Sequence, residues 1–99
     1  GRHHYHRNTT SDEPKALEYY EQAVRKDPNF AAPWAGIAHV WVNLRNMGLK
    51  SPEESLPKAL QAAGRALELD PNLVDGHLAL ARAKRDLEFD IAAAEVLAR

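Results

Sequence analysis

The chain has 99 residues, a length that suits one domain with a single hydrophobic core. Hydrophobic residues make up 44% and charged residues 27%, as in ordinary globular proteins, and the net charge of −1 shows no basic excess that would favour nucleic acid or an anionic membrane. Cysteine is absent, which excludes disulfides and thiolate metal sites and suits a reducing compartment. We expect a cytoplasmic protein with one domain over residues 1–99, with neither nucleic acid nor a membrane among its partners.

The first residues are rich in histidine, with His3, His4 and His6 close together. Imidazole is a common metal ligand, so a metal-sensing segment is one interpretation. However, three histidines at this spacing cannot all converge from one helix face, and no acidic residue precedes Asp12 to complete a ligand set. We therefore predict no metal site and keep metal sensing as a third alternative for function.

A first helix is predicted over residues 11–26. Thr10 and Glu13 form a capping box, which is a helix-start signal. Apolar residues then recur at helical spacing and predict one buried stripe, made of Ala16, Tyr19, Tyr20, Ala23 and Val24. Asp27-Pro28 ends the helix, because proline lacks an N–H and restricts the residue before it.

A second helix is predicted over residues 31–46, capped by Asn29 and ended by Gly48. Its stripe of Trp34, Ile37, Ala38 and Trp41 is expected to be buried. Ser51 and Pro52 give another helix start, but Pro57 follows so closely that its ring should clash with the preceding turn. We therefore expect an insertion over 45–56 with a short turn, and the third helix over 57–69.

The second Asp-Pro turn, at Asp70-Pro71, leads to a fourth helix predicted over residues 73–88. Its inward residues are expected to be Leu80, Ala81 and Leu87. Asp90 is a potential N-cap for a fifth helix over 91–99. His77 could belong to a catalytic site, but with no acid or nucleophile placed to assist it we interpret it as a packing residue.

The two turns belong to a repeat of 43 residues, since Asp27-Pro28-Asn29 recurs as Asp70-Pro71-Asn72. Trp34-x2-Ile37-Ala38-x2-Trp41 resembles the opening of a tetratricopeptide repeat, and Ala16-x3-Tyr20 with Pro28 resembles the close of an earlier one. The resemblance implies an all-α, TPR-like solenoid of antiparallel helix pairs, about two and a half repeats. The layout is most similar to TPR regions of bacterial cyclase-like and transcription-regulator multidomain proteins.

The chain starts without methionine and ends inside a helical pattern, so we expect it to be a fragment of a longer protein. A solenoid cut in this way leaves apolar faces open at its ends, here near Tyr5 and along residues 92–97. We therefore expect a homo-oligomer formed through these ends.

The sequence lacks the motifs that common enzymes use: it has no phosphate-binding loop, no zinc-protease motif and no nucleophile elbow. We expect no enzymatic activity, no catalytic residue and no cofactor. The resemblance implies a protein-interaction module that binds a peptide or partner protein through a concave groove, within a larger regulatory protein. The alternative is a structural or self-association spacer.

In the family, the groove is lined by the helix face that points away from the paired helix. The matching candidate residues here are Ala35, His39, Asn43, Leu78, Arg82 and Arg85. They lack the clamp by which chaperone-binding members hold a C-terminal carboxylate, so we predict no binding of chaperone tails. We expect instead a helix or extended segment with some acidic residues, although Arg82 and Arg85 could simply pair with neighbouring acids on a solvated face.

Overall fold

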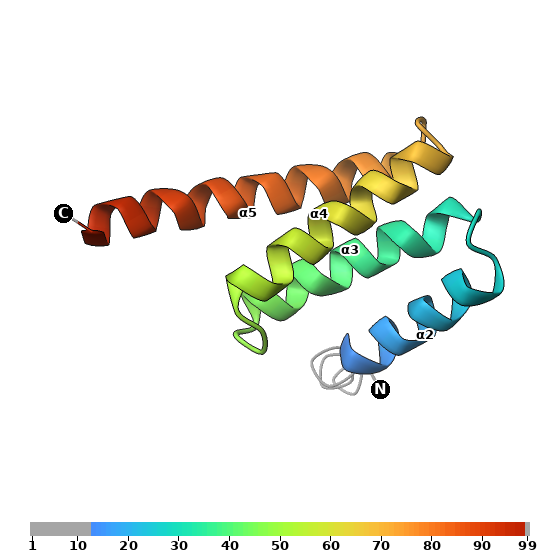
Figure 1. Cartoon of the computed structure of the whole chain (residues 1–99), viewed down its shortest axis with the longest axis horizontal. Coiled ribbons are helices and arrows are strands. Elements are labelled where there is room, and N and C mark those ends of the chain that lie inside the picture. The colour runs from blue at the N-terminus through green and yellow to red at the C-terminus, as the bar shows by residue number, and fades with distance from the viewer. Residues whose placement is uncertain (1–12, 99) are drawn as a thin grey trace, which may run out of the picture.

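A computed structural model describes the backbone of residues 13–98 and the side chains as far as Val96. Over that part of the chain the fold is all-α, with four helices and no strand. The helices are α2 (Glu13–Lys26), α3 (Ala31–Asn46), α4 (Pro52–Leu69) and α5 (Val74–Ala98). Figure 1 shows them fanned side by side, with the C-terminal half of α5 extending beyond the ends of α3 and α4.

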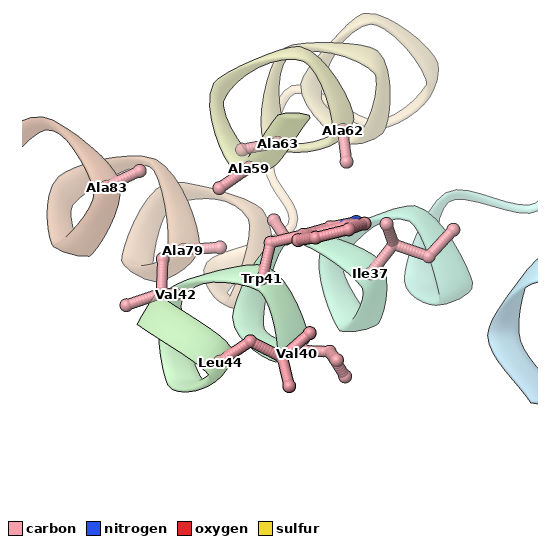
Figure 2. Close-up of a cluster of buried hydrophobic side chains, with 11 residues drawn as sticks. Ile37, Val40, Trp41, Val42, Leu44, Ala59, Ala62, Ala63, Ala79 and Ala83 are labelled. Atoms are coloured by element: carbon pink, nitrogen blue, oxygen red, sulfur yellow. The ribbon is translucent and has the colours of Figure 1, made fainter. Parts of the chain in front are cut away.

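Helix α3 is the centre of the arrangement, since it packs against α2, α4 and α5, while α4 also packs against α5. Its buried side chains meet small residues of the neighbouring helices, and Figure 2 shows Trp41 lying beneath Ala59, Ala62 and Ala63 of α4. Ala79 of α5 approaches α3 from the other side. Alanines on α4 and α5 let the helices come close, so the core is built from aromatic and branched residues of α3 against small partners.

The two Asp-Pro turns have the same hydrogen bonds. Asp27 N donates to Ala23 O and Phe30 N to Asp27 O, at 2.9 and 3.1 Å, and the equivalent bonds from Asp70 and Leu73 have the same lengths. Trp34 Nε1 donates to Pro28 O at 3.0 Å, and 43 residues later His77 Nε2 lies 2.7 Å from Pro71 O. The sequence repeat is therefore also a structural repeat at these turns, and His77 makes the bond that the tryptophan makes in the first copy.

The loop after α3 has the predicted glycine stop. Gly48 has a φ of +75°. Gly48 N donates to Arg45 O at 3.1 Å and Leu49 N to Leu44 O at 3.0 Å, which is the Schellman arrangement. Ser51 acts as the cap that its sequence signal indicated, since Ser51 Oγ accepts a hydrogen bond from Glu54 N at 3.2 Å.

Two predicted helix boundaries are wrong. Helix α4 begins at Pro52 and continues through Pro57, where a break was expected. The missing N–H of Pro57 costs one hydrogen bond, but the two residues before it, Ser55 and Leu56, are completely buried, so tertiary packing favours a continuous helix here. Helix α5 likewise runs through Asp90 without interruption, because the Asp90 side chain is bound by Arg45 instead of capping a new helix.

The predicted caps and stripes also need correction at single residues. The N-cap of α3 is Phe30 rather than Asn29, and it makes no side-chain capping bond. Tyr19 is 68% exposed and Ala81 is exposed, where both were expected to face inward. Trp34 is half-buried, whereas Ile37 and Trp41 are buried as predicted. Trp34 keeps part of its ring at the surface because its indole N–H reaches back to the Asp-Pro turn.

Candidate functional site

A chain of polar side chains joins three helices. Arg82 of α5 donates from Nη1 to His39 Nδ1 at 2.8 Å and from Nη2 to Asn43 Oδ1 at 2.7 Å, both on α3. Asn43 in turn donates from Nδ2 to Glu13 Oε1 of α2 at 2.6 Å. We call these four residues the polar chain; it fixes the first turn of α2, the middle of α3 and the middle of α5 relative to one another.

The polar chain determines the protonation of His39. A guanidinium has no acceptor, so Nδ1 must accept the bond from Arg82 and the imidazole is neutral. Burial lowers the pKa of His39 and the charge of Arg82 lowers it further, whereas Asp75 opposes both through its charge and a backbone hydrogen bond. The neutral form of the ring is therefore favoured, because a protonated His39 would lie next to the positive charge of Arg82.

A hollow of about 460 Å³ lies between α2 and α3, next to the polar chain. Aromatic and small residues line most of it, and its ionisable groups are Glu13, His39 and Asp75. The remaining lining residues are Ala16, Tyr19, Tyr20, Ala23, Phe30, Ala32, Pro33, Gly36, Val40 and Asn43. Tyr20 lies so close to Gly36 that a Cβ at that position would be 2.6 Å from its ring. Within the part of the chain that the structure describes, the hollow thus combines an aromatic wall with two carboxylates and has no lysine or arginine in its lining.

The six predicted groove residues do not form one surface in the structure. His39, Asn43 and Arg82 are brought together in the polar chain. Ala35 is 1% exposed and so forms part of the core rather than a groove floor. Leu78 is 52% exposed and Arg85 is exposed, both on α5, and neither lines the hollow between α2 and α3.

An ion-pair cluster between α3 and α5 was missed by the sequence analysis. Arg45 donates from Nε to Asp90 Oδ2 at 3.1 Å and also pairs with Asp90 Oδ1 through Nη2, and its Nη1 lies 3.8 Å from Asp86 Oδ2. The hydrogen bond to Asp90 raises the pKa of Arg45 above its ordinary value. Asp86 and Asp90 lie one helical turn apart, a spacing that indicates a shared partner, but nothing local to α5 indicates that this partner is Arg45.

A second cleft, of about 740 Å³, opens between α2 and α4 over the outer face of α3. Its floor contains Trp34, Ile37 and Trp41, and the ammonium of Lys58 lies 4.6 Å from the centroid of the Trp41 ring. A cation at that distance over an indole is attracted by the ring. These tryptophans were predicted only as core residues, so the open side of the stripe was also missed.

The N-terminal histidines lie outside the described residues, so the structure does not bear on them. Within residues 13–98, no group of three His, Cys, Asp or Glu side chains is placed to hold a metal ion. None of the four described helices is both long enough and apolar enough to cross a membrane.

Comparison with known proteins finds a similarity to a bacterial transcriptional regulator. Over 72 residues, or 73% of this chain, the sequence is 31% identical to the transcriptional regulator HilA of Salmonella typhimurium, and the same match is found with HilA of Salmonella typhi. The chain spans about 13% of the length of these relatives. No family model and no solved structure matches. The chain is therefore similar to one part of a bacterial transcriptional regulator.

Proposed function

We propose that this chain is a TPR-like protein-interaction module, without enzymatic activity, inside a larger bacterial regulatory protein. The matching hydrogen bonds of the two Asp-Pro turns support a repeat architecture. The similarity to HilA, which covers a small part of that regulator, supports the regulatory setting. In this proposal the helices form antiparallel pairs of a solenoid, and partners bind to the surfaces between helices.

Two surfaces that are equivalent in the repeat differ in how closely they are packed, and this difference supports the proposal. Four residues of α4 and α5 are completely buried in the core around α3: Ala59, Ala63, Ala79 and Ala83. Their equivalents, 43 residues earlier on α2 and α3, are Ala16, Tyr20, Gly36 and Val40, and all four line the hollow between α2 and α3. Among the described residues, the surface that packs closely in one copy of the repeat therefore borders a hollow in the other, although Val40 itself is only 3% exposed.

The hollow therefore suits an amphipathic helix of a partner protein, bound in the manner of a helix in a groove. The charges of its lining favour a basic partner segment, in place of the acidic one expected from the sequence. Arg82 already donates to His39 and Asn43, while Glu13 and Asp75 border the hollow. We infer that the partner helix presents an apolar face flanked by a lysine or arginine, which can pair with these carboxylates.

Helical peptides selected from a phage-displayed library against the 99-residue chain would test this function, with affinities measured by fluorescence anisotropy. Tyr19→Ala removes an exposed ring from the hollow and should weaken binding about tenfold or more, as aromatic hot spots do. Asp75→Lys should weaken peptides that carry a basic residue. Glu18→Ala, an exposed change on α2 outside the hollow, is the matched control and should leave affinity unchanged.

If no helical peptide is selected, or if Tyr19→Ala and Glu18→Ala bind the selected peptides equally well, the hollow is not the binding site. Circular dichroism of each variant shows whether a loss of binding reflects a loss of fold. A self-association role is a second candidate function, and an exposed face of α5 favours it.

A further inference from the structure

One face of α5 carries a regular series of side chains, of which all but Arg82 are exposed. The series is Leu78, Arg82, Arg85, Phe89, Ala92 and Val96, with successive spacings of 4, 3, 4, 3 and 4 residues. This is the heptad spacing by which helices pack against other helices. Phe89 and Val96 are each 67% exposed although both are large and apolar. We call this series the α5 seam.

The described helices leave the seam uncovered except at Arg82, which bonds to α3. The face of α5 that packs into the protein carries Ala79 and Ala83, which are completely buried. Further along α5, Asp90 pairs with Arg45 of α3. Figure 1 shows this end of α5 extending past α3 and α4. The C-terminal half of the seam is thus an apolar surface on a projecting helix.

The charges beside the seam have opposite signs at its two ends. Lys84 and Arg85 are exposed before Phe89, and Glu88 and Glu95 are exposed near and after it. Two such helices packed in parallel would place arginine against arginine along the seam, which is unfavourable. Packed antiparallel about a point near Asp90, they place Arg85 of each helix opposite Glu95 of the other. The charge pattern is therefore complementary to a second copy of itself in one orientation.

The antiparallel arrangement also fits the shape of the protein. If Arg85 faces Glu95, then Arg82 faces residue 98, so the overlap covers residues 82–98, a length of about 25 Å at the rise of an α-helix. The packed bodies of the two copies then lie at opposite ends of the helix pair. A two-fold arrangement of this kind is closed and stops at two copies.

We propose that the seam is a homodimer interface, in which the α5 helices of two copies pack antiparallel about a two-fold axis near Asp90, with Phe89 and Val96 in the contact and Arg85 opposite the partner's Glu95. The interface is separate from the hollow between α2 and α3. The dimer and the peptide-binding function can therefore each fail without the other.

Sedimentation velocity of the 99-residue chain over a wide concentration range tests the proposal, and a monomer–dimer equilibrium is the expected result. Phe89→Lys should weaken the dimer about tenfold or more, because it places a charge in the centre of the contact. Circular dichroism should show the fold unchanged, since the side chain is largely exposed.

A charge exchange tests the orientation. Arg85→Glu alone should weaken the dimer, and the double variant Arg85→Glu with Glu95→Arg should restore it, because each partner then presents the reversed pair. Lys15→Glu, which reverses an exposed charge on α2, is the control and should have no effect. A chain that stays monomeric, assemblies that grow beyond two copies, or a double variant that fails to recover would each overturn the proposal.

Discussion

Arg82 and Arg85 lie three residues apart on α5, and the structure predicts very different consequences for their removal. Arg82 makes two hydrogen bonds to α3, and Arg82→Ala leaves His39 Nδ1 and Asn43 Oδ1 without that donor. A hydrogen bond to a charged group contributes about 1.5–3 kcal/mol, and because these bonds are only partly buried we take the low end. With two such bonds lost, the variant should therefore lose about 3 kcal/mol of unfolding free energy.

Arg85 provides the matched comparison, because it is exposed and makes none of the polar-chain contacts. Arg85→Ala should change the unfolding free energy by less than about 0.5 kcal/mol. Urea denaturation followed by circular dichroism measures both variants, at a concentration low enough to keep the chain monomeric. Equal stabilities for Arg82→Ala and Arg85→Ala would refute the structural role of the polar chain. The alternative that both arginines lie on a solvated face fits Arg85 but not Arg82, which is bound to α3.

The two tryptophans of α3 should also differ in what they contribute. Trp41→Ala removes a ring that is 7% exposed and packs under α4, and thermal and urea unfolding should show a loss of about 3–5 kcal/mol. Trp34→Ala should cost clearly less, because Trp34 is only half-buried and its indole N–H bonds to a turn carbonyl at the surface. If Trp34→Ala proves the more destabilising of the two, the assignment of the core to the Trp41 side of α3 is wrong.

What could be predicted from the sequence was mostly local. The Asp-Pro turns and the glycine stop at Gly48 depend on backbone restrictions of the residues themselves, and these were confirmed. Pro57 and Asp90 were mispredicted for the opposite reason. Each is a local helix-breaking or capping signal, but Leu56 burial and the Arg45 pairing are tertiary interactions that outweigh it.

The candidate site depended even more on distant contacts. His39, Asn43 and Arg82 were selected because each lies on the expected groove face of its own helix. Their hydrogen bonds, however, join residues far apart in the sequence: Arg82 is 43 positions from His39 and 39 positions from Asn43. No pattern within either helix shows that Arg82 donates its hydrogen bonds to α3. It was therefore predicted to be a partner-binding residue of the groove. The carboxylates of Glu13 and Asp75 became relevant only once the hollow placed them at one site.

The protonation of His39 gives a last prediction, which links the polar chain to pH. The pKa of His39 in the folded chain lies below the ordinary value of 6.5, so near that pH the unfolded chain binds more protons than the folded one. The stabilisation from neutral His39 is therefore complete above pH 6.5 and is lost as the pH falls from there through the lower, folded pKa. The groups that face the ring are Arg82, which would repel the imidazolium, and Asp75, which would attract it.

Urea midpoints for the wild type and His39→Gln, measured in steps from about pH 7.5 to about pH 5, isolate this effect. The glutamine oxygen can still accept the bond from Arg82 but does not titrate in this range, and the titration of the other groups cancels in the difference. The wild type should lose stability relative to the variant as the pH falls below 6.5. Parallel pH profiles would show that the attraction of Asp75 for the imidazolium balances burial and Arg82, and a wild type that gains on the variant in acid would show that it outweighs them; either result contradicts the prediction.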